Sequence, residues 1–231
     1  MTTYGEYVEV EVGDDYVATV ELCRPPNNFF NQAMMAALAD ALEALDQDDR
    51  CRASVLCSQG KHFCAGANFG EAERNILSQR GRHLYEETVR LFDTNKPIVA
   101  AVQGAAIGGG LGVALLADFR VAAPEARFSA NFARIGFHHG FGLSVTLPRV
   151  VGHQKALDLL YRGPRLKGEQ ALAIGLCDEL VPLDELRARA RALAADIAGS
   201  APLSIESIRR TMRGDLPELI KQATDRERQE Q

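Results

Sequence analysis

The chain has 231 residues, of which 46% are hydrophobic and 25% are charged. This length and composition are typical of one globular domain, or of one domain with a helical appendage. The net charge is −5 with both signs interspersed, and Trp is absent, so a nucleic-acid-binding surface is not expected. No apolar run approaches the roughly 20 residues that a membrane-spanning helix needs, so we expect no membrane partner.

The N-terminus and the cysteines predict a cytoplasmic protein. The opening residues, MTTYGEYVEVEV, are acidic and lack the basic and apolar regions of a signal peptide. The cysteines show no metal-ligand spacing, so we expect reduced thiols and no metal site. Cys64 lies in a predicted loop, where we interpret it as a small packing residue. The five cysteines are Cys23, Cys51, Cys57, Cys64 and Cys177.

Hydrophobic periodicity predicts an α/β chain. Residues 7–12 and 16–22 alternate apolar and polar side chains around a Gly-Asp-Asp turn, which indicates a hairpin. Residues 32–46 have the apolar spacing of an amphipathic helix. Predicted strands then follow at 53–58, 98–103 and 119–123. One predicted helix begins directly after the glycines at 108–110, and the others lie at 71–92, 143–151, 154–160, 168–174, 183–198 and 203–212. Strands that alternate with helices, followed by helices alone, favour a sheet-based core with a C-terminal helical region.

The segment 96–118, KPIVAAVQGAAIGGGLGVALLAD, is the most informative part of the chain. Three consecutive glycines open a run with helix character, which indicates that the backbone lies where a Cβ would intrude. Free N–H groups at a helix start attract an anion or an oxygen that gains negative charge.

Two predicted strand-to-loop corners carry small residues, Ala65-Gly66-Ala67 and Gly108-Gly109-Gly110. If the strands before them are neighbours in one sheet, an N–H group from each corner can converge on one oxygen, as in an oxyanion hole. The spacing alone is equally compatible with two tight turns. A dinucleotide-binding oxidoreductase is disfavoured, because neither the G-x-G-x-x-G pattern nor an acidic residue after the strand at 119–123 is present.

Four segments together resemble the enoyl-CoA hydratase/isomerase family, the crotonase superfamily. They are HFCAGANF (62–69), PIVAAVQGAAIGGGLGVALLADFRVAA (97–123), RFSANFARIGFHHGFGLSVTLPRVVG (127–152) and LKGEQALAIGLCDELVP (166–182), in the family's order and spacing. The resemblance implies a crotonase-like spiral of ββα units with a C-terminal helical trimerisation region, and a homotrimer or homohexamer. It divides the chain into a core, 1–195, and a helical region, 196–231, which is shorter than in most members.

The resemblance also implies an acyl-CoA substrate, with coenzyme A present as part of the thioester and no other cofactor. Motif matching assigns the N–H groups of Ala67 and Gly109 to the oxygen of a thioester enolate. Asp118 matches a structural aspartate. The residues expected near the coenzyme A moiety are Arg24, Lys61, Ala65, Gly66 and Gly110.

The chain departs from the family pattern where hydratases carry two glutamates, because those positions are Gly112 and Phe132 here. Neither side chain transfers protons, so we expect an enolate reaction other than ordinary hydration, such as isomerisation or decarboxylation. The alternative is a catalytically silent acyl-CoA-binding homologue. His138 and His139 are the candidate replacements, since other branches place a carboxylate near Gly140 and imidazole titrates close to neutral pH.

The same loop and the preceding helix leave other interpretations open. The alternative role for one of the two histidines is to fix the loop by donating to a backbone carbonyl. In the predicted helix 71–92, Tyr85 can reach a pocket, whereas Glu86 and Glu87 are expected on a solvated face.

Overall fold

A seven-stranded sheet forms the centre of the protein, in a computed structural model that describes residues 1–67 and 83–231. Residues 71–82 of the predicted helix 71–92 therefore lie outside the described residues. The first three strands pair antiparallel and the remainder pair parallel. In spatial order the strands are β1 (Thr2–Tyr4), β2 (Val8–Val12), β3 (Val17–Leu22), β4 (Ala53–Ser58), β5 (Ile98–Val102), β7 (Phe119–Ala122) and β10 (Glu179–Leu180).

Strands β4 and β5, which precede the two glycine-containing corners, are neighbours in the sheet. They pair in parallel, with Val55 opposite Val99 and Leu56 opposite Ala100. All six residues of β4 and all five of β5 are buried, which explains their continuous apolar character in the sequence. The chain therefore leaves both strands at the same edge of the sheet.

A second sheet has three strands. It consists of β6 (Ala105–Ile107), β8 (Arg127–Ser129) and β9 (Leu166–Lys167), with β6 and β8 parallel. The prediction of helices alone after residue 124 was wrong, because β8, β9 and β10 follow that point. Strands of two or three residues are too short to produce a readable alternation.

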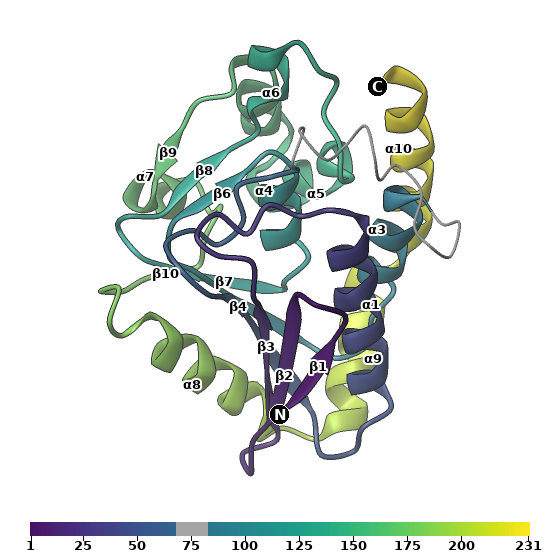
Figure 1. The fold of residues 1–231 in the computed structure, drawn as a ribbon, viewed down its shortest axis with the longest axis vertical. Coiled ribbons are helices and arrows are strands. Elements are labelled where there is room, and N and C mark those ends of the chain that lie inside the picture. Colours follow the sequence, from purple (N-terminus) through teal and green to yellow (C-terminus); the bar gives the residue numbers. More distant parts are fainter. Residues whose placement is uncertain (68–82) are drawn as a thin grey trace.

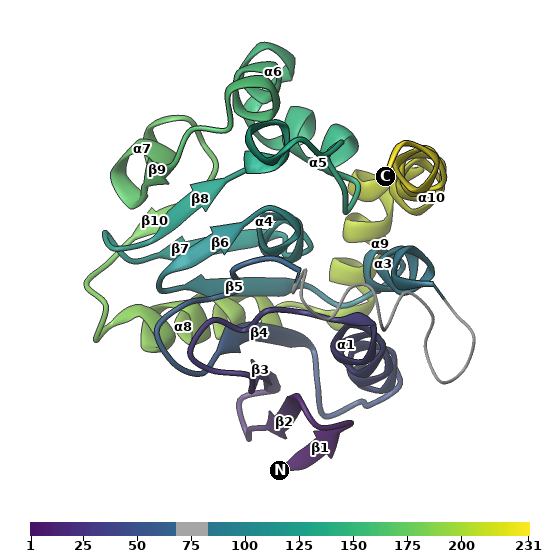
Figure 2. The same ribbon diagram turned by 45° about the horizontal axis from the view of Figure 1, so that its top comes forward.

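Helices cover both faces of the large sheet (Figures 1 and 2). On one face, Ala190 and Ala194 of α8 pack with Val55, Val99 and Val121. On the other face lie α1, α3 and α4, and α10 runs beside α3. The described helices are α1 (Gln32–Asp46), α3 (Leu84–Phe92), α4 (Gly109–Ala114), η1 (Asn131–Ile135, a 3₁₀ helix), α5 (Leu143–Val151), α6 (His153–Arg162), α7 (Gly168–Ala173), α8 (Leu186–Ala198), α9 (Pro202–Arg213) and α10 (Leu216–Glu230).

Helix α1 forms where the local sequence predicts it. The side chain of Asn31 caps its start by accepting the N–H of Met34 at 3.0 Å. Met35, Leu38 and Leu42 bury the apolar face that the spacing predicts.

Asp118, at the end of the loop after α4, ties α9 to the sheet. Its carboxylate accepts the N–H of Ile98 at 2.8 Å and Nε of Arg209 at 2.9 Å, and Arg213 lies 3.2 Å away. Burial alone would raise the pKa of Asp118, but the two guanidinium groups hold that pKa below its ordinary value. This carboxylate therefore organises the start of β5 and the C-terminal helices.

We expect Asp118→Ala to lower the free energy of unfolding by about 3 kcal/mol or more, because it leaves two largely buried guanidinium groups without their anion. Urea denaturation measures this. The matched control is Asp215→Ala, whose 70%-exposed carboxylate pairs with Arg149 at the surface and should cost less than about 1 kcal/mol. Equal losses in the two variants would contradict the assignment.

Candidate active site

The first corner, residues 62–67, runs between β6 and the segment 27–30. On one side Cys64 donates its N–H to the carbonyl of Ala105 at 2.8 Å and accepts the N–H of Ile107 at 3.1 Å. On the other side Ala65 donates to the carbonyl of Asn27 at 2.9 Å. Cys64 is fully buried, and burial raises its thiol pKa to about 12, which agrees with a packing role.

The backbone of Gly66 sets the direction of the Ala67 N–H group. The Gly66 carbonyl accepts the N–H of Phe30 at 3.0 Å. In a trans peptide the carbonyl and the following N–H point in opposite directions, so the N–H of Ala67 points away from Phe30, toward the β6 side. Gly66 has φ +102°, and a Cβ there would lie 3.0 Å from the carbonyl oxygen of Ile107. Glycine is therefore required at this turn.

The second corner is the start of α4. The carbonyl of Gly108 accepts the N–H of Leu111 at 3.0 Å, so the following N–H, that of Gly109, points out of the helix N-terminus. A Cβ on Gly110 would lie only 2.0 Å from the carbonyl oxygen of Cys64, so α4 begins directly against the first corner. Within residues 1–67 and 83–231, no backbone carbonyl accepts a hydrogen bond from the N–H of Ala67 or Gly109.

Aromatic rings surround the start of α4. A Cβ on Gly109 would meet the ring of Phe30 at 2.5 Å, and a Cβ on Gly112 would meet the ring of Phe141 at 2.5 Å. The rings of Phe30 and Phe141 contact each other, with centroids 5.6 Å apart. A carboxylate side chain at position 112 therefore has no room unless Phe141 moves.

The two predicted histidines stack in the loop before α5, with ring centroids 4.2 Å apart. Nδ1 of His138 lies 2.8 Å from the carbonyl oxygen of His139, so this imidazole contacts the loop backbone. Nε2 of His139 lies 3.9 Å from Oε1 of Glu227. Both histidines line a cavity of about 370 Å³ together with Phe132 and Phe137.

Glu227, on α10, is a candidate functional residue that the sequence analysis missed. Its side chain is 1% exposed, and both carboxylate oxygens accept the N–H of Gly142 at 3.1 Å. Burial raises its pKa to about 8, although the N–H groups of Gly142 and Phe141 lower it. Burial, with the neighbouring His138, lowers the pKa of His139 to about 4. A glutamate on the same helical stripe as Leu216 and Ile220 was the available signal.

Helix α3 contributes a tyrosine to the same region. The hydroxyl of Tyr85 donates to Oε1 of Gln231 at 2.7 Å, and it would lie 2.6 Å from a Cβ on Gly140. The expectation that Glu87 is solvated was wrong, because α1 packs against this face of α3. Glu87 is 2% exposed, accepts a hydrogen bond from Gln32 of α1 and pairs with Arg90 of its own helix. Glu86 is exposed, as predicted.

The residues predicted to contact coenzyme A fall into two groups. Ala65, Gly66 and Gly110 lie in the two corners described above, and Lys61 is exposed just before the first corner. Arg24 donates to the carbonyl of Phe29 at 2.8 Å and stacks over Tyr7, with 5.1 Å from its guanidinium carbon to the ring centroid. Contact with coenzyme A stays a prediction for all of them.

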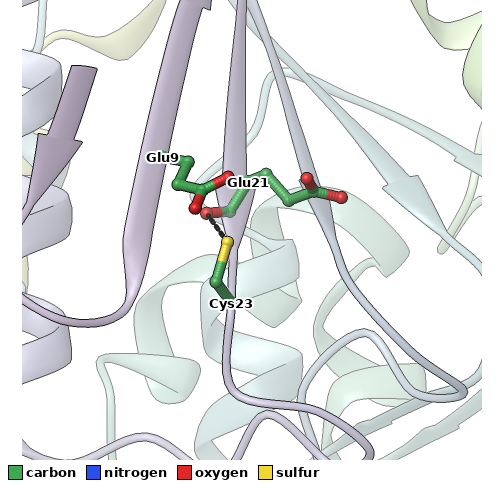
Figure 3. Close-up of side chains that lie close together, drawn as sticks. All are labelled: Glu9, Glu21 and Cys23. Carbon is green, nitrogen blue, oxygen red and sulfur yellow. Dashed lines mark hydrogen bonds between the residues drawn. The ribbon is translucent and has the colours of Figure 1, made fainter. Parts of the chain in front are cut away.

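A group of potential metal ligands lies at the end of β3, formed by Glu9, Glu21 and Cys23 (Figure 3). Glu21 is paired with Arg187, and the thiol of Cys23 donates to the backbone carbonyl of Glu21. Burial and the two glutamates raise the pKa of Cys23 to about 11, which disfavours the thiolate that a metal would need. This group therefore carries no functional assignment. Among the described helices, none has both the length and the apolar character to cross a membrane.

Comparison with known proteins shows the family to which the chain belongs. A model of the enoyl-CoA hydratase/isomerase family matches residues 13–231. The chain is 33% identical over 204 residues to a probable enoyl-CoA hydratase of Bacillus subtilis, covering 84% of this chain and 78% of that protein. It is 32% identical over 209 residues to a peroxisomal fatty acid β-oxidation multifunctional protein of Arabidopsis thaliana, covering 88% of this chain but only 29% of that protein.

Among solved structures, the crystal structure of an enoyl-CoA hydratase/isomerase from Pseudoalteromonas atlantica superposes with a TM-score of 0.90 and 32% identity, covering 97% of this chain and 90% of that one. The chain therefore belongs to the enoyl-CoA hydratase/isomerase family and has the α/β crotonase fold with C-terminal helices. Members of this family act on CoA thioesters.

We expect Gly110→Ala to lower the free energy of unfolding by about 2 kcal/mol or more, because its Cβ would press on the backbone of Cys64 and force the two corners apart. Chemical denaturation measures the change. Gly199→Ala is the control, since its Cβ would meet no atom closer than 3.4 Å and should change stability by less than about 0.5 kcal/mol.

Glu227 also predicts a pH dependence of stability. Its folded pKa of about 8 exceeds the ordinary value of 4.5, so between these pH values the folded chain keeps a proton that the unfolded chain releases. Its stabilising contribution is complete below about pH 4.5 and is lost as pH rises through about 8. Thermal unfolding of wild type and Glu227→Gln from pH 5 to 9 should therefore show a wild-type Tm that falls relative to the variant. Parallel curves would contradict the buried, protonated carboxyl.

Proposed function

We propose that the chain is an acyl-CoA enzyme that forms a thioester enolate and holds its oxygen with the N–H groups of Ala67 and Gly109. The observation that supports this most directly is the pair of peptide groups whose N–H bonds point away from their own chain neighbours at two adjoining corners. Donors fixed in advance stabilise the charge that develops on the oxygen without reorganising during the reaction.

The reaction best supported is isomerisation, or another reaction that begins with proton transfer at the α carbon. Isomerisation needs a single group that removes a proton from one carbon and returns it to another. Hydration also needs activation of a water molecule, for which hydratases of this family use two glutamates. The resemblance places Gly112 and Phe132 there, and Phe141 fills the space beside Gly112. We infer that His139 or His138 transfers the proton.

The partners follow from the same proposal. We propose that Arg24, Lys61, Ala65, Gly66 and Gly110 lie near the coenzyme A moiety, that the core comprises residues 1–195, and that the helical region 196–231 supports a homotrimer or homohexamer.

A second candidate function is acyl-CoA binding without turnover. The phenylalanine rings of Phe30 and Phe141 favour it, because they line the start of α4 with groups that cannot carry protons.

The test is exchange of the α hydrogens of butanoyl-CoA in D₂O, followed by mass spectrometry, beside an assay of crotonyl-CoA hydration. Exchange reports enolate formation whatever the later steps of the reaction are. We expect exchange by the wild type, with little hydration. Binding of butanoyl-CoA without exchange would favour the silent homologue.

The oxyanion hole is tested by Ala67→Pro, which removes the N–H group, with Ala67→Ser as the control that keeps it. We expect Ala67→Pro to slow exchange by about 10²- to 10³-fold, and Ala67→Ser to stay close to wild type. Thermal unfolding of both variants establishes that they are folded. Equal exchange rates in the two variants would remove Ala67 from the site.

A further inference from the structure

Helix α10 places a buried carboxylate against the loop that carries the two histidines. The helix runs beside α3 and contacts α5, and its C-terminal end reaches the loop before α5 (Figures 1 and 2). There Glu227 accepts the N–H of Gly142 with both oxygens, and Oε1 lies 3.9 Å from Nε2 of His139. No other described acidic side chain pairs with either of these histidines.

Contact with Glu227 also accounts for an unusual backbone conformation at residues 141 and 142. Phe141 and Gly142 both have left-handed conformations, with φ +63° and +66°. This conformation is costly for a bulky residue such as Phe141 and persists only where the surroundings fix it. The N–H groups of these successive residues converge on the carboxylate of Glu227, as in an anion-binding nest. The carboxylate therefore fixes the loop that sets the position of His139.

We propose that Glu227 is a positioning residue that makes His139 the proton-transfer group of the candidate active site. This inference rests on the function proposed above. His139 lines the 370 Å³ cavity, and so does Phe132, whose ring would lie 3.6 Å from a Cβ on Gly108. The ring of Phe132 therefore borders both the cavity and the start of α4.

The proposed step is a proton transfer. The bond between the α carbon and its hydrogen breaks, the electron pair moves into the enolate held by Ala67 and Gly109, and the proton goes to Nε2 of neutral His139. Return of that proton to carbon regenerates the imidazole, so no co-reactant is consumed. Ionised Glu227 stabilises the imidazolium across 3.9 Å, because charges attract more strongly in a buried setting than in water.

The ionisation of Glu227 gives the step a pH dependence, which comparison with Glu227→Gln separates from that of the neighbouring groups. Tyr85, from α3, has a pKa raised well above its ordinary value, chiefly by burial, and stays neutral below pH 9. His138 faces the backbone carbonyl of His139. Other titratable groups of α3 and α10 line a separate groove of about 340 Å³, namely His83, Glu86, Lys221, Asp225 and Arg228.

The experiment measures exchange of butanoyl-CoA in D₂O at pH 6 and pH 9 for the wild type, Glu227→Gln and His139→Gln, after subtraction of the uncatalysed rate. At pH 6 the carboxyl is protonated and resembles the amide, so wild type and Glu227→Gln should agree within about 2-fold. At pH 9 the wild type should be at least about 10-fold faster than Glu227→Gln. His139→Gln should lose about 10²-fold or more at both pH values.

Glu230→Gln is the matched control, because it makes the same change at an exposed position of α10 and should follow the wild type. A Glu227→Gln variant slowed by the same factor at both pH values would have lost only structure, and the inference would be overturned. Full exchange in His139→Gln would overturn it as well, and thermal unfolding establishes that this variant is folded. Both results leave the proposed function standing, whereas no exchange by the wild type removes both.

Discussion

The whole site depends on how closely the start of α4 approaches the backbone of residues 64–67. The gap is narrower than a methyl group, because a Cβ on Gly110 would lie 2.0 Å from the carbonyl oxygen of Cys64. Parallel pairing of β4 and β5 brings both corners to one sheet edge, and β6 joins them through its bonds to Cys64. The glycines therefore matter because they lack a Cβ, which lets two peptide groups from different segments approach and face one space.

Because a peptide group is planar, a hydrogen bond to its carbonyl also fixes the direction of its N–H group. The carbonyl of Gly66 is committed to Phe30 and that of Gly108 to Leu111, so the N–H groups that follow them must point the other way. Each of these two glycines has a positive φ, which lets the chain turn at that peptide. Donors fixed in this way need no side chain, and their direction depends only on backbone bonds elsewhere.

The parts of this arrangement that were predictable from the sequence are local. The spacing of Met35, Leu38 and Leu42 predicted α1, continuous apolar runs predicted β4 and β5, and the glycine triplet predicted a close backbone approach. The short strands β8 to β10 were missed because their pairing comes from distant segments. The buried state of Glu87 depends on α1, 55 residues earlier at Gln32.

Glu227 was missed for a further reason, since the sequence around it, ATDRERQE, reads as a solvated helix. Its burial arises only when α10 packs on α3 and α5, and no local pattern encodes the N–H groups that meet it.

Phe141 connects the central helix with the C-terminal one. Its ring occupies the space in front of Gly112, where a longer side chain on α4 would otherwise project, and so keeps that space apolar. To reach there, its backbone adopts a left-handed conformation, and that conformation turns the N–H groups of residues 141 and 142 toward α10. A buried N–H donor requires an acceptor, and Glu227 supplies it for Gly142. The residue that excludes a carboxylate from α4 is therefore the same one that creates a place for a carboxylate on α10, beside His139.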